Sequence, residues 1–208
     1  MRALFKSLPD TLILPGLNGS GENHWQQHWA RDHPSSMVVE QENWVQPDFD
    51  VWRVRLAAAI SASDGVWLVA HSLGCLLAAQ LATSAVAHKV RGALLVAPCD
   101  LEATARLHPG VVLPLAMPLR RLPFPSIIVA GLNDPYMPFD TLRHVAADWG
   151  SDLVEIGAAG HINVASGFGR WTNGYEIFER LKRMDAGQPR RSGTESASQE
   201  GCYTVWPY

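Results

Sequence analysis

The chain has 208 residues, 47% of them hydrophobic, which is enough to bury one well-packed domain and short for two. A formal net charge of −3 at pH 7 gives no reason to expect nucleic acid or an anionic membrane surface as a partner. The three cysteines form no CxxC pair, which argues against a disulfide framework and against a zinc site. Small molecules or short peptides are the expected partners.

The first ten residues contain no long apolar stretch, so they lack the core of a secretory signal peptide. No segment of the chain has enough consecutive apolar residues to cross a membrane. Together with the odd number of cysteines, these features predict a soluble protein of the cytoplasm.

A short apolar run at residues 11–14 enters a glycine-rich segment at residues 15–21. The run predicts a buried strand that ends in a loop at the carboxyl edge of a sheet. A plain turn explains the glycine-rich segment equally well when that segment is taken alone.

A helix is expected next, because Trp25 and Trp29 are four residues apart and would pack together on a sheet. His24 and His28 have the same spacing. They lack the glutamate of an HExxH motif and a clear third ligand, so a metal site is not predicted.

Residues 37–40 predict a second short strand, followed by a loop at residues 41–47. Asp48 is a suitable cap for a helix that reaches about Ser61. Apolar residues recur along this segment at roughly helical spacing, which predicts one buried face.

The stretch from residue 66 to residue 82 is an apolar, strand-like run that breaks at Ser72 into an alanine-rich, helical run. Small residues, Ala70 and Gly74, lie two positions to either side of the serine, as a sharp strand-to-helix turn requires. Such a turn would expose the Ser72 hydroxyl above the sheet and direct the Leu73 N–H at a bound carbonyl. The pattern also occurs by chance, and Ser72 could simply cap the helix.

Three further strands are predicted at residues 91–97, 126–130 and 152–156, with helices at residues 139–149 and 172–184. Strands that alternate with helices form βαβ units. The expected fold class is therefore α/β, a three-layer α/β/α core with a mostly or fully parallel sheet.

Two segments have no clear periodicity. Residues 101–125 are rich in proline and would either cover part of a pocket or form a connection with one helix, without building a full cap domain. Residues 1–184 are expected to form the compact domain, and residues 185–208 a disordered tail. Because the tail ends in aromatic residues, it could dock on a protein partner.

A serine hydroxyl needs a base to accept its proton and a third group to orient that base. In the α/β-hydrolase arrangement these groups follow successive strands in the order Ser, acid, His, and Ser72, Asp134 and His161 satisfy both order and location. The N–H groups of Leu73 and Leu17 are the candidate oxyanion donors. This chemistry requires no cofactor and no metal.

Other residues compete for these roles or could line the pocket. Asp100 also follows a strand and could be the acid, although Asp134 lies after a later strand, where the acid is more usual. His71 is expected to turn away from Ser72 and line the pocket or satisfy backbone, whereas His108 and His144 are interpreted as ordinary surface histidines. The candidate pocket residues are Asn18, His71, Trp44 and Met117.

Five short motifs between residues 11 and 183 carry a family resemblance: His24-Trp25-Gln26 with Trp29, Trp44 with Pro47 and Asp48, His71-Ser72-Leu73-Gly74, Asn133-Asp134-Pro135, and Gly160-His161-Ile162-Asn163. With these motifs the chain resembles the YdeN and retinoblastoma-binding-protein-nine family of small serine hydrolases. The resemblance implies a compact α/β-hydrolase core without a full cap, and a triad that falls on Ser72, Asp134 and His161.

The resulting expectation is a serine hydrolase that cleaves small carboxylic esters through an acyl-enzyme intermediate. Two alternatives remain open. One is a serine aminopeptidase or amidase with the same triad, which an acidic residue such as Asp100 or Glu102 facing the pocket would favour. The other is a protein-interaction module built on a hydrolase scaffold.

Overall fold

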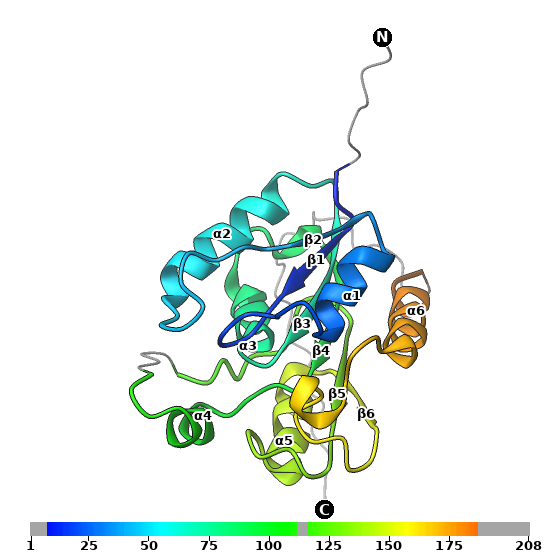
Figure 1. Ribbon diagram of the computed structural model, residues 1–208. Helices are drawn as coiled ribbons and strands as arrows, with labels where there is room; N and C mark the ends of the chain where they lie inside the picture. The colour runs from blue at the N-terminus through cyan, green and yellow to red at the C-terminus, as the bar shows by residue number, and fades with distance from the viewer. Residues whose placement is uncertain (1–7, 112–115, 187–208) are drawn as a thin grey trace, which may run out of the picture.

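The computed structural model describes residues 8–111 and 116–186. Its centre is a six-stranded, fully parallel sheet with the strand order β2-β1-β3-β4-β5-β6 (Figure 1). The strands are β1 (Thr11–Leu14), β2 (Ser36–Val38), β3 (Val66–His71), β4 (Val90–Val96), β5 (Ser126–Ala130) and β6 (Asp152–Glu155). The predicted α/β class with a parallel sheet is confirmed.

The described residues form six α-helices: α1 (Trp25–Asp32), α2 (Phe49–Ser61), α3 (Leu73–Ala79), α4 (Leu101–Leu107), α5 (Phe139–Trp149) and α6 (Thr172–Ala186). Within the described residues, no helix is long and apolar enough to cross a membrane. Short 3-10 turns follow α3, precede β4 and follow the loop after β6.

The two faces of the sheet carry separate apolar cores, because successive residues of a strand point to opposite sides. Leu12 and Leu68 face the core formed with α2, α3 and α5. Ile13 and Val69 face the core formed with α1 and α6, on the other side of the sheet (Figure 1). Helices on both faces explain why the central strands are uninterrupted apolar runs.

The helix after Asp48 begins and ends where the sequence predicts. The Asp48 carboxylate accepts the N–H groups of Asp50 and Val51, so it satisfies two of the unpaired donors at the start of α2. The tryptophans of α1 pack in the core against the sheet, as expected from their spacing.

The bounds of four elements differ from the prediction. β4 begins and ends one residue earlier than the predicted 91–97, and β6 ends at Glu155 instead of residue 156. The second strand was expected at residues 37–40 but is Ser36–Val38, since pairing with β1 begins at Ser36 and extends only to Val38. The last helix continues to Ala186, where an ion pair of 3.3 Å joins Asp185 to Arg91 of β4.

The segment predicted either as a partial cover or as a connection with one helix contains α4, and residues 112–115 within it lie outside the described residues. The tail from residue 187 onward, including its aromatic end, also lies outside them. Its predicted disorder and docking role therefore stay predictions.

Candidate active site

Ser72 occupies the sharp turn between β3 and α3, with φ of 54° and ψ of −123°. Residues with side chains rarely adopt positive φ, and such strain is found at functional sites. The turn brings the chain close to its neighbours: a Cβ atom on Gly74 would lie 2.1 Å from the Leu14 carbonyl oxygen, and one on Gly16 would lie 2.7 Å from Ser72 Cβ. Glycine at both positions is what permits this approach.

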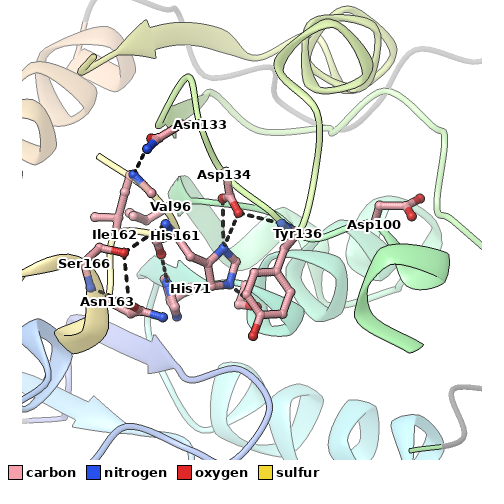
Figure 2. A network of polar contacts seen from close by, with 12 residues as sticks. His71, Val96, Asp100, Asn133, Asp134, Tyr136, His161, Ile162, Asn163 and Ser166 are labelled. Carbon is pink, nitrogen blue, oxygen red and sulfur yellow. Dashed lines mark hydrogen bonds and ion pairs between the residues drawn. The ribbon is translucent and has the colours of Figure 1, made fainter. Parts of the chain in front are cut away.

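A continuous chain of hydrogen bonds joins three side chains at the carboxyl edge of the sheet. Figure 2 shows the part of it between His161 and Asp134. His161 Nε2 lies 2.9 Å from Ser72 Oγ, and His161 Nδ1 lies 2.8 Å and 3.0 Å from the two carboxylate oxygens of Asp134. With Nδ1–H donating to the carboxylate, Nε2 is free to accept the serine proton. The structure thus brings together the three residues proposed from the sequence.

These groups are shielded from solvent. The side chains of His161 and Asp134 are 6% and 4% exposed, and Ser72 is buried as well. The Asp134 carboxylate also accepts the backbone N–H of Tyr136 at 2.8 Å. Electrostatic interactions are stronger in such a setting than in water, which favours pairing between the carboxylate and a charged imidazole.

The loop that carries His161 is fixed by side chains on both sides. The Gly160 N–H donates to Asn133 Oδ1 at 2.7 Å, and the His161 N–H donates to Ser166 Oγ at 3.1 Å. The His161 carbonyl oxygen accepts a hydrogen bond of 2.9 Å from His71 Nε2 (Figure 2). His161 is therefore oriented through its backbone as well as through Asp134.

Two backbone N–H groups are available for an oxyanion. Leu73 is the first residue of α3, and the first N–H groups of a helix have no partner within it. Leu17 lines the cavity, and its N–H has no acceptor among the described residues. The loop conformation depends on Asn18, which has a φ of 64° and donates its N–H to the Trp44 carbonyl at 2.8 Å.

Three histidine rings lie in series beside the serine. The ring centroids of His24 and His71 are 4.9 Å apart, as are those of His71 and His161. Burial, and then the charge on His161, lowers the pKa of His24 to about 4. The same two causes, followed by the charge on His24, hold the pKa of His71 well below its ordinary value. Both rings are therefore neutral at pH 7.

A cavity of about 150 Å³ opens beside Ser72. Its lining comes from the loop after β1, the histidine series, α4 with its C-cap, and the loops after β5 and β6: Leu17, Asn18, Gly19, His24, His71, Ser72, Thr104, His108, Tyr136, His161 and Asn163. Of the four pocket candidates named from the sequence, Asn18 and His71 are at this cavity.

Trp44 and Met117 are not brought to the cavity. Trp44 packs over Gly19 and against Trp52, so it supports the glycine-rich loop after β1 without lining the cavity. Met117 packs against the core of α2, α3 and α5. The prediction for His108 as a surface residue is wrong, because its Nε2 pairs with the Tyr136 hydroxyl at 2.8 Å and its ring lines the cavity.

Sequence reasoning missed several lining residues. Tyr136 stacks on His161, yet its only signal was its place two residues after Asp134. Thr104 and His108 have helical spacing, but nothing in the weakly periodic segment around them indicated which face they share. Asn163 belongs to the motif that contains His161, although no role was assigned to it.

The residues considered for competing roles make other contacts. The Asp100 carboxylate caps α4 by accepting the Ala103 N–H at 2.8 Å and does not reach His161 (Figure 2). His24 caps α1, while His28 Nδ1 lies 3.2 Å from an Arg31 nitrogen. Over residues 8–111 and 116–186, no group of three or more metal-ligating side chains is found.

Comparisons with known proteins identify the family of the chain. A model of the serine hydrolase family matches residues 11–180. A solved YdeN-like hydrolase from Pectobacterium atrosepticum is 30% identical over 86% of this chain and 92% of its own, with a TM-score of 0.73. The chain therefore belongs to the serine hydrolase family, as a YdeN-like member.

More distant structures share the fold. The ydeN gene product of B. subtilis is 20% identical over 83% of this chain and 98% of its own, with a TM-score of 0.66. Esterase 2 of Thermogutta terrifontis is 16% identical over 88% of this chain and 85% of its own, with a TM-score of 0.63. No curated protein matches the chain.

Proposed function

We propose that this hydrolase cleaves small carboxylic esters through an acyl-enzyme intermediate, with Ser72 as nucleophile, His161 as general base and acid, and Asp134 as the group that orients His161. The observation that carries the proposal is the unbroken chain of hydrogen bonds from Ser72 Oγ through His161 to Asp134. A serine hydroxyl without such a base is a poor nucleophile at neutral pH.

In the first half of the reaction, Ser72 Oγ attacks the ester carbonyl carbon while its proton passes to His161 Nε2. The N–H groups of Leu73 and Leu17 stabilise the resulting oxyanion, a contribution of about 3 kcal/mol for each donor. As the tetrahedral species collapses, the bond to the alcohol oxygen breaks and His161 gives that oxygen its proton. The acyl group is then esterified to Ser72.

In the second half, His161 removes a proton from water, and the water oxygen attacks the acyl carbon. Collapse releases the carboxylic acid and returns the proton to Ser72 Oγ. Throughout, the Asp134 carboxylate fixes the tautomer of His161 and stabilises its charged form.

We also propose that the reaction needs neither metal nor cofactor, because the side chains and backbone amides supply nucleophile, base and oxyanion donors. Activity that survives prolonged treatment with EDTA is the expected result. We further propose that the protein works in the cytoplasm and that residues 202–208 bind a protein partner.

Esters are favoured over peptides with a free N-terminus. An aminopeptidase must recognise an ammonium group, for which a carboxylate at the pocket is the usual partner. Among the described lining residues no free carboxylate is present. The Asp100 carboxylate caps α4, and Glu102, whose side chain is 90% exposed, pairs with Arg106.

The test compares p-nitrophenyl esters of short acids with aminoacyl p-nitroanilides as substrates. Wild-type protein is expected to turn over the esters faster, and Ser72→Ala and His161→Ala are expected to lose at least about 10³-fold in kcat. Faster cleavage of the anilides would favour the amidase alternative. Ester hydrolysis that survives both substitutions would exclude the proposed mechanism.

A further inference from the structure

His24 is a buried polar residue at the cavity to which the proposed mechanism gives no role. It is 6% exposed, it precedes the first residue of α1, and it lines the cavity that contains Ser72. Only the ring of His71 separates it from His161 in the histidine series.

The hydrogen bonding of His24 determines which ring nitrogen carries a proton. The Gln26 backbone N–H donates to His24 Nδ1 at 3.2 Å. A backbone N–H can only donate, so Nδ1 has no proton and the neutral ring holds its proton on Nε2. No residue in the described part of the chain accepts a hydrogen bond from that Nε2–H. His24 lines the cavity, and no described contact occupies its Nε2 donor.

Asn163 provides a second donor at the cavity. Its Oδ1 accepts both the backbone N–H and the hydroxyl of Ser166, at 3.0 Å and 3.1 Å. The amide NH₂ group of Asn163 is therefore left to donate. The lining that the structure describes includes no lysine, arginine, aspartate or glutamate. A charged ligand group would have no counter-charge there, whereas a neutral oxygen would find donors.

We infer that the cavity selects small, uncharged esters that carry a second oxygen acceptor close to the scissile carbonyl, and that His24 Nε2–H donates to this oxygen. Ether, hydroxyl and carbonyl oxygens share this acceptor chemistry. A site that presents a hydrogen-bond donor to the substrate favours one that carries the matching acceptor over one that lacks it. The inference rests on the proposed ester hydrolysis and adds a substrate class to it.

The test uses two pairs of esters that differ by one oxygen in place of a methylene. In the first pair, p-nitrophenyl methoxyacetate and p-nitrophenyl butyrate, the extra oxygen is in the acyl group. In the second, 2-methoxyethyl acetate and butyl acetate, it is in the alcohol. For each pair, kcat/KM for the methoxy ester is divided by kcat/KM for the methylene ester, and this ratio is measured in wild-type and variant protein. Intrinsic differences in ester reactivity cancel when the ratios are compared.

Two substitutions remove the Nε2 donor in different ways. His24→Phe keeps an aromatic ring, and His24→Ser keeps an acceptor for the Gln26 N–H and hence the cap of α1. The matched control is His28→Phe, one turn further along α1 and not part of the cavity lining. We expect the ratio to fall about tenfold in both His24 variants in at least one pair of esters, and to stay unchanged in the control.

Ratios that stay within twofold of wild type in both pairs would overturn the inference. So would an equal loss with the methoxy and the methylene esters, because that pattern indicates only a structural role for His24. Covalent labelling of Ser72 by a fluorophosphonate is measured on the same wild-type sample. Absence of labelling would refute the proposed serine mechanism itself, whereas labelling with unchanged ratios would refute only the role of His24.

Discussion

The Tyr136 ring stacks on the imidazole of His161, with centroids 3.9 Å apart and an interplanar angle of 27°. The same residue donates its backbone N–H to Asp134, while its hydroxyl pairs with His108 at the end of α4. Its carbonyl oxygen accepts the Asp100 N–H at the start of α4. Tyr136 therefore links α4, at the cavity, to both His161 and Asp134.

Removing the Tyr136 ring is expected to loosen His161. Tyr136→Leu should lower kcat about tenfold, since an aromatic stack contributes about 0.5–1.5 kcal/mol beyond simple burial. Tyr136→Phe keeps the ring and should stay within about threefold of wild type in kcat. Steady-state kinetics with one short p-nitrophenyl ester measures both. Equal losses in the two variants would show that the hydroxyl, not the stack, is what matters.

The two candidate acids can be separated by the same isosteric change. Asp134→Asn is expected to reduce kcat by roughly 10⁴-fold, because an amide donor stabilises the wrong tautomer of the histidine. Asp100→Asn should leave kcat nearly unchanged, since asparagine caps a helix as well as aspartate does. Comparable kcat values for the two variants would contradict the assignment of Asp134.

The tight turn around Ser72 depends on glycine. Gly74→Ala would place a methyl group on the Leu14 carbonyl and is expected to lower the free energy of unfolding by about 3 kcal/mol or more. Gly21→Ala, in the loop between β1 and α1 and with no atom within 4 Å of the added carbon, should change it by less than about 1 kcal/mol. Urea unfolding gives both values, and similar stability of the two variants would contradict the packing described.

The stability of the fold should depend on pH through the buried histidines. Burial lowers the pKa of His24 to about 4 and that of His71 well below its ordinary value, 6.5. Between about pH 4 and pH 6.5 the unfolded chain binds more protons than the folded one. The free energy of unfolding therefore rises with pH across this window, by up to about 1.4 kcal/mol per pH unit for each histidine.

The contribution of His24 is isolated by comparing urea unfolding of wild type and His24→Ser at pH 4.5, 5.5, 6.5 and 7.5. Serine retains a cap for α1 but does not titrate. The variant should show a shallower rise with pH than wild type. Identical slopes would mean that His24 is not held neutral in the folded state.

Local patterns were sufficient for most of the fold. The capping carboxylate of Asp48 and the apolar spacing after it predicted α2 correctly. Uninterrupted apolar runs predicted the buried strands β3 and β5 to within one residue. Both signals arise from neighbouring residues in the chain, so no knowledge of tertiary contacts was needed.

The wrong predictions concern side chains whose positions depend on tertiary packing. His108 reaches the cavity because it pairs with Tyr136, 28 residues later, and no local pattern encodes that pair. Trp44 was expected at the pocket, but its ring packs against Trp52 and over Gly19 instead. Asp134 and His161 were found because parallel strands bring their following loops to one edge, a rule that fixes position without side-chain detail.

The central claim is that Ser72 is the nucleophile, and covalent labelling tests it most directly. The intact mass of wild-type protein is measured after reaction with a fluorophosphonate probe, and the modified peptide is then mapped. One adduct per chain, on Ser72, and none in Ser72→Ala is the predicted result. An unlabelled wild-type protein, or equal labelling of Ser72→Ala, would contradict the account.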